Sequence, residues 1–432
     1  MTGWEDFIYF FSFSDQNINN VLIGTALLGI VGGLVGSLVV LSKRTLVIDA
    51  ISHSMLPGIA LGFLISGIKD PLYLLLGGMT TSALSVLMIN AFVNRSKIKP
   101  DAAIAITLSV LFSIGVILLN LVQNTGNPNQ SGLNDFLFGK AASMLSSDLK
   151  YFAILNLFAL TIIPIFYRQF KIGIFDPIFG HTIGIQRNFV QFLISLLTIL
   201  TAAAGIQTVG IILMSAIIIA PASAALFWTR NFSKVMMIAA GIGISCSIAG
   251  VYISYLFPEM PTGPWVVVVL ATLSLFSVLL SPRGLIAKQL QIALNRKKIK
   301  IENCLKSLYK VQFNEKRILE SVTAEELAHH LFLPSSKLEK TLKKLKRKHW
   351  VIHIGNSYCL TDKGKIEAER IIRIHRLWEL YLEKYMALPP HLVHDSAESI
   401  EHVITPELER ALTKIMGKPI FDPHQQKIPY HD

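Results

Sequence analysis

The feature that most constrains this chain is a series of uncharged apolar runs, each long enough to cross a membrane. A bilayer core about 30 Å thick requires about 20 apolar residues in a helix. Because proline can break a helix, Pro57 and Pro221 could change the span count by one. Nine transmembrane helices are predicted, at residues 21–41, 51–68, 71–93, 102–122, 151–167, 189–206, 209–228, 235–256 and 264–281.

Charge divides the chain into two parts. Residues 1–285 contain 24 charged side chains, whereas the shorter segment 286–432 contains 44. Since soluble domains are about 25% charged, the first part is predicted to be a membrane domain and the second a soluble basic domain. This balance excludes a disordered chain and a single soluble enzyme domain. The three cysteines, far apart and without a CxxC motif, exclude a zinc ribbon and a disulfide framework.

Basic residues between alternate apolar runs predict the topology. Positively charged loops stay in the cytoplasm, so the N-terminus is expected outside and the C-terminus inside a bacterial cytoplasmic membrane. The first twenty residues lack a basic segment, and no cleavable signal peptide is expected. The basic connections contain Lys43, Arg44, Arg95, Lys97, Lys99, Arg168, Lys171, Arg187, Arg230, Lys234, Arg283 and Lys288.

Asp49 and His53 are ionisable residues at the edge of an apolar run, in the stretch VIDAISHSMLPGIALG. Four residues apart, they share one face of a helix. A carboxylate and an imidazole suit a divalent cation of borderline hardness. The alternative is an Asp–His pair that only stabilises the end of the helix.

Four segments resemble the integral-membrane subunits of ABC transporters for manganese, zinc and iron. They are DAISHSMLPGIALG, KPDAAIAITLSVLFSIGVIL, FDPIFGHTIGI and QTVGIILMSAIIIAPASAA, within residues 49–225. The resemblance implies that Asp49 and His53 lie on the translocation path. It also implies that Phe175, Asp176 and Pro177 belong to a cytoplasmic loop that docks on the ATPase.

The sequence contains no GxxxxGK[ST] motif for nucleotide phosphates. The chain is therefore not expected to be an enzyme. A separate ATPase subunit and an external metal-binding protein, periplasmic or extracellular, are expected as partners. A secondary carrier is the alternative for this half, but the motifs and the lack of a dense intramembrane acidic relay disfavour it.

Residues 286–300, IAKQLQIALNRKKIK, are predicted to be a basic linker. Its positive charge could hold it against anionic lipid. Alternatively, the linker is cut and releases the C-terminal fragment to the cytoplasm.

The order of elements in 301–365 is typical of a winged helix-turn-helix. VTAEELAHHL opens with a capping box, Thr323 with Glu326, and alternating runs around Gly355 and Asn356 predict a hairpin. A Lys-rich second helix would read DNA. Its alternatives are a solvated basic face and a protein-interaction module. The candidate DNA contacts are Ser335, Ser336 and Lys337 at base edges, with Lys337, Lys340 and Lys344 among the lysines at phosphates.

Histidine and glutamate cluster near the C-terminus. Glu398, Glu401 and His402 share one helix face, His375 and Glu379 form a second i, i+4 pair, and His394 lies between them in sequence. Such a set can bind metal. The alternative is surface charge in helical ion pairs.

The stretch RIHRLWELYLEKYM and the residues that follow it to 429 resemble the metal-binding and dimerisation domain of the diphtheria-toxin-repressor family. The resemblance implies that 366–432 form this domain, in a homodimer that binds a DNA operator. It implies one metal site at His375, Glu398, Glu401 and His402 and an ancillary site at His375, Glu379 and His394. The oxygen and nitrogen donors favour manganese or ferrous iron, with zinc also expected to bind.

One segment departs from the family pattern. In IENCLKSLYKV, Asn303 and Lys306 stand where ligands are normal, and a protonated lysine cannot ligate a metal.

The fold class predicted is an all-α polytopic membrane bundle, residues 1–285, followed by the winged helix-turn-helix and a helical metal-binding and dimerisation domain. The function predicted is a metal permease fused to a metal-dependent repressor. The alternative is a permease whose tail senses metal and gates transport without binding DNA.

Overall fold

The computed structural model describes residues 3–124, 137, 139, 146–257, 260–314, 317–318, 321–331, 335–402 and 404–430. The chain forms two compact units, Met1–Ala287 and Lys288–Asp432.

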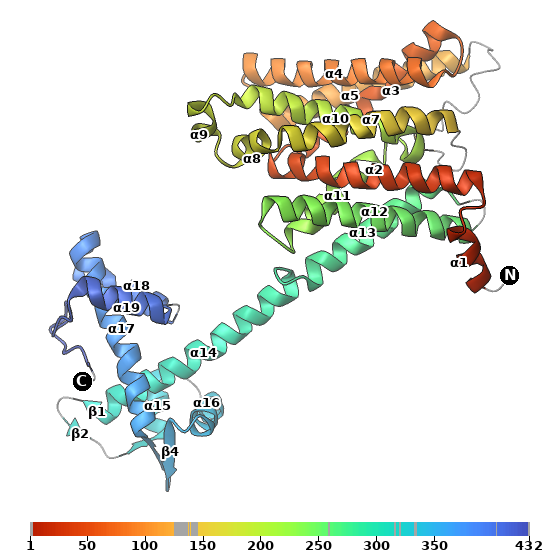
Figure 1. Ribbon diagram of the computed structural model, residues 1–432. Coiled ribbons are helices and arrows are strands. Elements are labelled where there is room, and N and C mark those ends of the chain that lie inside the picture. The colour runs from red at the N-terminus through yellow and green to blue at the C-terminus, as the bar shows by residue number, and fades with distance from the viewer. Residues whose placement is uncertain are drawn as a thin grey trace. The chain divides into compact units, whose positions relative to one another are not determined.

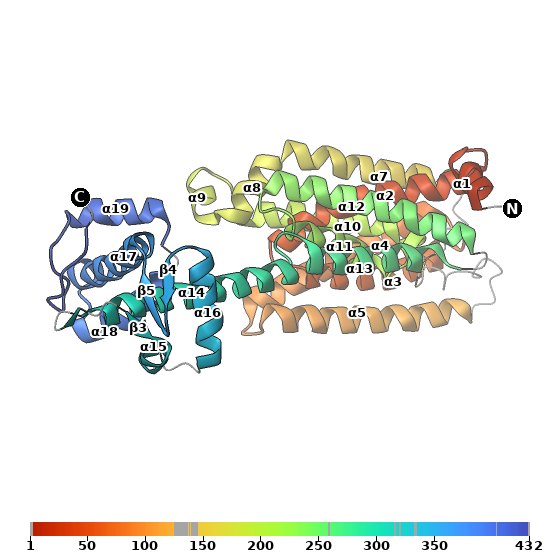
Figure 2. The ribbon, with the colours of Figure 1, turned by 90° about the horizontal axis from the view of Figure 1, so that it is seen from below.

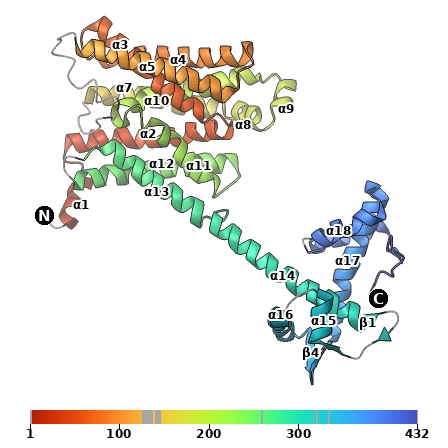
Figure 3. The same cartoon turned by 180° about the vertical axis from the view of Figure 1, so that it is seen from behind.

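The first unit is a helical bundle. Helix α2 packs against α12, α11 and α10, and lies between the α3–α5 group and the α11–α13 group (Figures 1 and 3). Helix α1 and the pair α8–α9 lie at opposite ends of the bundle (Figures 1 and 2). The helices are α1 Gly3–Phe11, α2 Gln16–Leu41, α3 Leu46–Ser66, α4 Pro71–Arg95, α5 Pro100–Gln123, α7 Ser146–Ile165, α8 Tyr167–Phe175, α9 Pro177–Thr182, α10 Arg187–Val209, α11 Met214–Leu226, α12 Phe232–Leu256 and α13 Thr262–Leu280.

The expectation of nine spans is not confirmed. In the described part of the chain, seven helices are long and apolar enough to cross a membrane. An eighth results if α7 and α8 count as one span, although they meet at a 67° bend. The run at 209–228 contains only the 13-residue helix α11, because Gly210 at the end of α10 interrupts the run. Pro57, by contrast, lies inside the continuous helix α3.

Glycine allows α2 and α12 to pack closely. A Cβ atom placed on Gly243 would lie 2.0 Å from the Gly29 carbonyl oxygen, and one on Gly33 would lie 2.4 Å from that of Ala239. Close backbone approach supplies van der Waals contact where lipid provides no hydrophobic drive between helices.

The second unit combines helices with a small antiparallel sheet of strand order β3-β5-β4. The segment expected as a linker, 286–300, is helical and is continuous with the segment 301–311. The elements are α14 Leu285–Gln312, β1 Phe313–Asn314, β2 Arg317–Ile318, β3 Val322–Thr323, α15 Ala324–Leu331, α16 Ser335–Arg347, β4 Val351–Ile354, β5 Ser357–Leu360, α17 Asp362–Met386, α18 Pro390–Ile400 and α19 Pro406–Met416.

Local sequence signals account for the start of α15 and for the hairpin. The Thr323 amide donates to Glu326 Oε2 at 2.9 Å and the Glu326 amide donates to Thr323 Oγ1 at 3.3 Å, which confirms the capping box. Strands β4 and β5 pair on either side of Gly355 and Asn356, as the alternation predicts. Helices α14, α15 and α16 bury Leu305, Leu308, Leu327 and Leu342 in a common core.

Candidate metal sites and interaction surfaces

Asp49 and His53 lie on α3, one turn apart. Both are half-buried, whereas their neighbours Ile48, Ala50, Ile51 and Ser52 are buried, as expected if the two polar residues share a less enclosed face. The His53 ring packs edge-on against Phe112 of α5, with ring centroids 5.1 Å apart. His53 Nδ1 is buried and has no hydrogen-bond partner in the described part of the chain. A buried imidazole nitrogen without a partner fits a ligand that is present only transiently.

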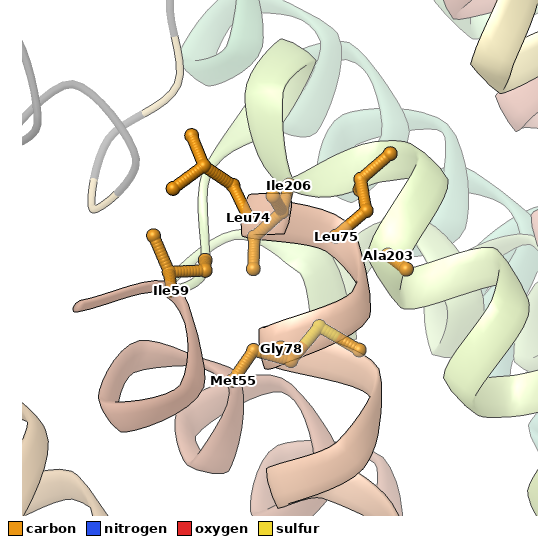
Figure 4. A pocket seen from close by; sticks show the side chains of 7 residues that line it. All are labelled: Met55, Ile59, Leu74, Leu75, Gly78, Ala203 and Ile206. Carbon is orange, nitrogen blue, oxygen red and sulfur yellow. The ribbon is translucent and has the colours of Figure 1, made fainter. Parts of the chain in front are cut away.

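A cavity between α3, α4 and α10 offers no oxygen or nitrogen ligand for a metal (Figure 4). Its volume is about 10 Å³, at the lower limit for holding one water molecule. Only apolar groups line it, from Met55, Ile59, Leu74, Leu75, Gly78, Ala203 and Ile206.

Helices α8 and α9 form an exposed apolar corner. Asp176 joins the two helices and accepts a hydrogen bond from the Phe179 amide at 2.9 Å, which caps α9. Phe175, Ile178 and Phe179 are all more than half exposed. A groove beside them is lined by Arg168, Lys171, Ile172, Phe175, Asp176 and Phe179.

Helix α16 has one apolar and one basic face. Leu338, Leu342 and Leu345 are buried, while Lys340 and Lys344 are exposed. Ser335, Ser336 and Lys337 begin the helix, but their side chains lie outside the described part of the structure.

The second unit brings His375, Glu379 and His394 together. Glu379 Oε1 lies 3.0 Å from His375 Nε2 and 2.8 Å from His394 Nδ1, and the two nitrogens are 3.2 Å apart. His375 and Glu379 come from α17 and His394 comes from α18, which packs against it (Figure 3). One carboxylate oxygen and two imidazole nitrogens within 4.8 Å of one another fit a divalent transition metal. We call these three residues the triad.

In the other predicted metal set, Glu401 contacts both His375 and His402, but Lys306 also bonds to Glu401. Glu401 and His375 are in contact, with Oε2 2.5 Å from Nδ1, but Glu398 is exposed. Lys306 Nζ donates to both Glu401 oxygens, at 2.9 and 2.8 Å, and lies 3.3 Å from His375 Nδ1. The ammonium group therefore stands where an ion between Glu401 and His375 would bind. These residues do not fit a metal while Lys306 is protonated.

His402 has a partner that the sequence patterns do not indicate. Its Nδ1 lies 2.7 Å from Glu302 Oε2 on α14, and its Nε2 lies 3.4 Å from Glu401 Oε1. Lys298, one turn before Glu302, donates to the His402 carbonyl oxygen at 3.1 Å. The only sequence signal for these contacts is the spacing of Lys298, Glu302 and Lys306 along one face of α14. We call Lys298, Glu302, Lys306, Glu401 and His402 the α14 clamp.

Electrostatics keeps Glu379 of the triad and Glu401 of the α14 clamp ionised. Burial would raise the pKa of Glu379, but hydrogen bonds with His375 and His394 lower it to about 2. Burial would also raise the pKa of Glu401, yet its hydrogen bond with His375 and the Lys306 charge lower it. The pKa of His375 is raised, because its bonds to Glu379 and Glu401 outweigh the effect of burial. The triad is thus anionic at Glu379 and titratable at His375.

The fold and these sites define a polytopic membrane protein that carries a C-terminal unit with a candidate metal centre. Residues 14–281 match the ABC 3 transport family. Residues 361–430 match the iron dependent repressor, metal binding and dimerisation domain. The chain belongs to the ABC 3 transport family and joins its permease domain to a repressor-type domain.

Known relatives share this arrangement to different extents. The manganese transport system membrane protein MntC of Bacillus subtilis is 35% identical over 374 residues, which is 86% of this chain and 85% of the relative. A probable metal transport system membrane protein of Chlamydia trachomatis is 26% identical over 441 aligned residues, covering 96% and 97% of the two chains. The structure of PsaBC from Streptococcus pneumoniae in complex with Fab has a TM-score of 0.57 at 29% identity, covering 62% of this chain and 94% of that one.

Proposed function

We propose that this chain is the permease subunit of an ABC importer for a divalent transition metal, manganese, iron or zinc, fused to a metal-dependent transcriptional repressor. The observation that carries the proposal is the triad, which lies in a domain that follows the match to the ABC 3 transport family. The permease domain is residues 1–285, the helical linker 286–300, the winged helix-turn-helix 301–365 and the metal-binding and dimerisation domain 366–432.

In the permease, Asp49 and His53 are proposed to line the translocation path. Their shared face on α3 supports this role, as does the His53 nitrogen, which has no hydrogen-bond partner among the described residues. Phe175, Asp176 and Pro177 are proposed to dock on a separate ATPase subunit, and a separate metal-binding protein delivers the ion outside. The bacterial cytoplasmic membrane is the proposed location, with a cytoplasmic C-terminus.

Uptake measurements test the transport role. The chain and its ATPase are expressed together, and uptake of radioactive Mn²⁺ is compared for wild type, Asp49→Ala and His53→Ala. We expect uptake to fall at least about tenfold in each variant, since each removes one ligand type from the path. Normal uptake by the double variant, at equal complex in the membrane, would reject the assignment.

In the repressor, Ser335, Ser336, Lys337, Lys340 and Lys344 are proposed to contact the operator of a homodimer. The exposed lysines of α16 support this over the alternative in which the C-terminal unit only gates transport. Gel-shift assays with the DNA upstream of the chain's own operon, with and without Mn²⁺ and Fe²⁺, test it. Metal-dependent binding that weakens in Lys340→Ala/Lys344→Ala is expected, and unchanged metal-dependent transport regulation without any DNA binding would favour the gating alternative.

A further inference from the structure

We propose that Lys306 is a built-in cation that replaces a metal ion in the α14 clamp, so that of the two predicted metal sites only the triad binds metal. This inference deepens the proposed metal sensing of the triad and rests on it. In this arrangement Glu401 and His402 are structural residues of the clamp, and α14 is held to 401–402 whether or not metal is present.

The first argument is occupancy. The Glu401 side chain is fully buried and that of Lys306 is 8% exposed, so solvent does not compete for their bonds. Both Glu401 oxygens accept from Lys306 Nζ, and Oε2 also contacts His375 Nδ1. An ion between Glu401 and His375 would need to lie within about 2.0–2.2 Å of its ligands. That position overlaps the ammonium group, so the ion and the ammonium group would compete for the same carboxylate.

The second argument concerns His375, which lies between the two clusters. Its Nδ1 faces Glu401 and its Nε2 faces Glu379 and His394. A ligating histidine normally donates its other ring N–H to a carboxylate, which fixes the tautomer and the ring orientation. Glu401 is in the position to accept that proton, and this leaves the Nε2 lone pair for an ion at the triad. Glu401 therefore positions a ligand rather than acting as one.

The third argument is the repeated pattern on α14. Lys298, Glu302 and Lys306 are spaced by four residues, and each contacts residue 401 or 402. Lys298 Nζ also lies 3.7 Å from Glu302 Oε1. The charges of these three α14 residues alternate in sign, and each pairs with a complementary group of residue 401 or 402. Such charge-assisted hydrogen bonds hold α14 against residues 401–402. No metal is needed to bring these groups together.

Metal stoichiometry at saturation tests the proposal on the full-length protein in detergent. Bound Mn²⁺ per chain is measured by equilibrium dialysis and elemental analysis, relative to wild type. Lys306→Met should gain about one ion, because Glu401 then loses its internal cation and its carboxylate can ligate together with His402 Nε2, which lies 3.4 Å away. Glu401→Gln should leave the number unchanged, and Lys306→Met/Glu401→Gln should return to the wild-type number. Lys310→Met is the matched control, since Lys310 is exposed one turn further along α14 and lines the same cavity.

The outcomes separate the inference from the function on which it rests. Loss of an ion in Glu401→Gln, or no gain in Lys306→Met, would overturn the role of Lys306. If Lys306→Met does not fold, Glu401→Gln alone still decides, because a true ligand would lose its ion. His394→Ala should lose about one ion relative to wild type. No loss there would reject metal sensing by the triad, while the result for Lys306 would stand by itself.

Discussion

At the residue scale, the proposed metal site of the triad predicts that metal binding depends on pH through His375. Hydrogen bonds to Glu379 and Glu401 raise its pKa, so in the metal-free protein it becomes protonated at a higher pH than an ordinary histidine. Protonation of His375 stabilises the folded state, because the His375 pKa is higher in the folded than in the unfolded protein. This stabilisation is complete at pH values below the pKa of His375 in the unfolded protein, and it is lost as the pH rises through the pKa of His375 in the folded protein. Metal needs the neutral ring and competes with this proton.

We therefore expect Mn²⁺ affinity to fall by at least about tenfold per pH unit once the pH is below the His375 pKa, because every imidazole ligand must be neutral to bind the ion. Glu379, with a pKa of about 2, stays ionised throughout and adds no pH dependence of its own. Calorimetric titration of the full-length protein with Mn²⁺ between about pH 5.5 and 8 measures the slope. His424→Ala is the control, because His424 lines the same cavity outside the triad and should leave the slope intact. A flat profile would contradict the role of His375.

Sequence spacing predicts some of these contacts and cannot predict others. His375 and Glu379 are one turn apart on one helix, so their proximity follows from helical geometry. The pair of His402 and Glu302 is separated by 100 residues, and no local pattern indicates it. Glu398 shares its expected helix face with Glu401 and His402, yet it is exposed, because spacing predicts a face but not which neighbour covers it.

At the scale of elements, the packing of α2 on α12 can be tested with two glycines of the same helix. Gly243→Ala places a Cβ 2.0 Å from the Gly29 carbonyl oxygen, whereas a Cβ on Gly241 meets nothing within 4 Å. We expect Gly243→Ala to destabilise the bundle by about 1–3 kcal/mol and Gly241→Ala to leave it nearly unchanged. Thermal unfolding in detergent compares the two, and equal melting temperatures would show that the helices are not in such close contact.

The apolar corner of α8 and α9 gives a second test at this scale. Phe179→Glu should reduce co-purification of the ATPase, because a charge replaces an exposed apolar side chain at the proposed docking surface. Phe13→Glu is its control, since Phe13 is similarly exposed, 58% against 53%, and follows α1 at the opposite end of the bundle. If both variants retain the ATPase equally, the corner is not the docking surface.

Elements with strong local signals were predictable, and those shaped by tertiary packing were not. The capping box of α15 and the hairpin around Gly355 depend on a few neighbouring residues. The short helix α11 and the bend between α7 and α8 interrupt apolar runs that look long enough to span a bilayer. Hydrophobicity alone does not distinguish a straight span from a broken one.

At the scale of the whole molecule, a tethered repressor reaches only DNA that approaches the membrane. Lipid would also compete with DNA phosphates for basic residues near the surface, at up to about 1 kcal/mol each. We therefore predict cleavage within 286–300 and release of the C-terminal fragment to the cytoplasm. Since this segment lies in α14, a protease can cut it only after local unwinding.

An antibody against the C-terminus, used on fractionated native cells, measures release. A soluble species of about 15 kDa is expected, in proportion to 47.9 kDa for 432 residues. Only full-length membrane protein in cells whose operator still responds to metal would show that the tethered form regulates.

Pro57 has a consequence for the chemistry of the proposed translocation path. Asp49, His53 and Pro57 follow one another at intervals of four on α3, and Gly115 of α5 lets the two helices meet at the proline. Proline has no amide hydrogen, so it cannot donate to the carbonyl oxygen four residues earlier, which belongs to His53. A hard or borderline cation passing Asp49 and His53 would thus meet a backbone oxygen that lacks its normal helical donor, beside a carboxylate and an imidazole. Three kinds of ligand atom would come from two residues of one helix.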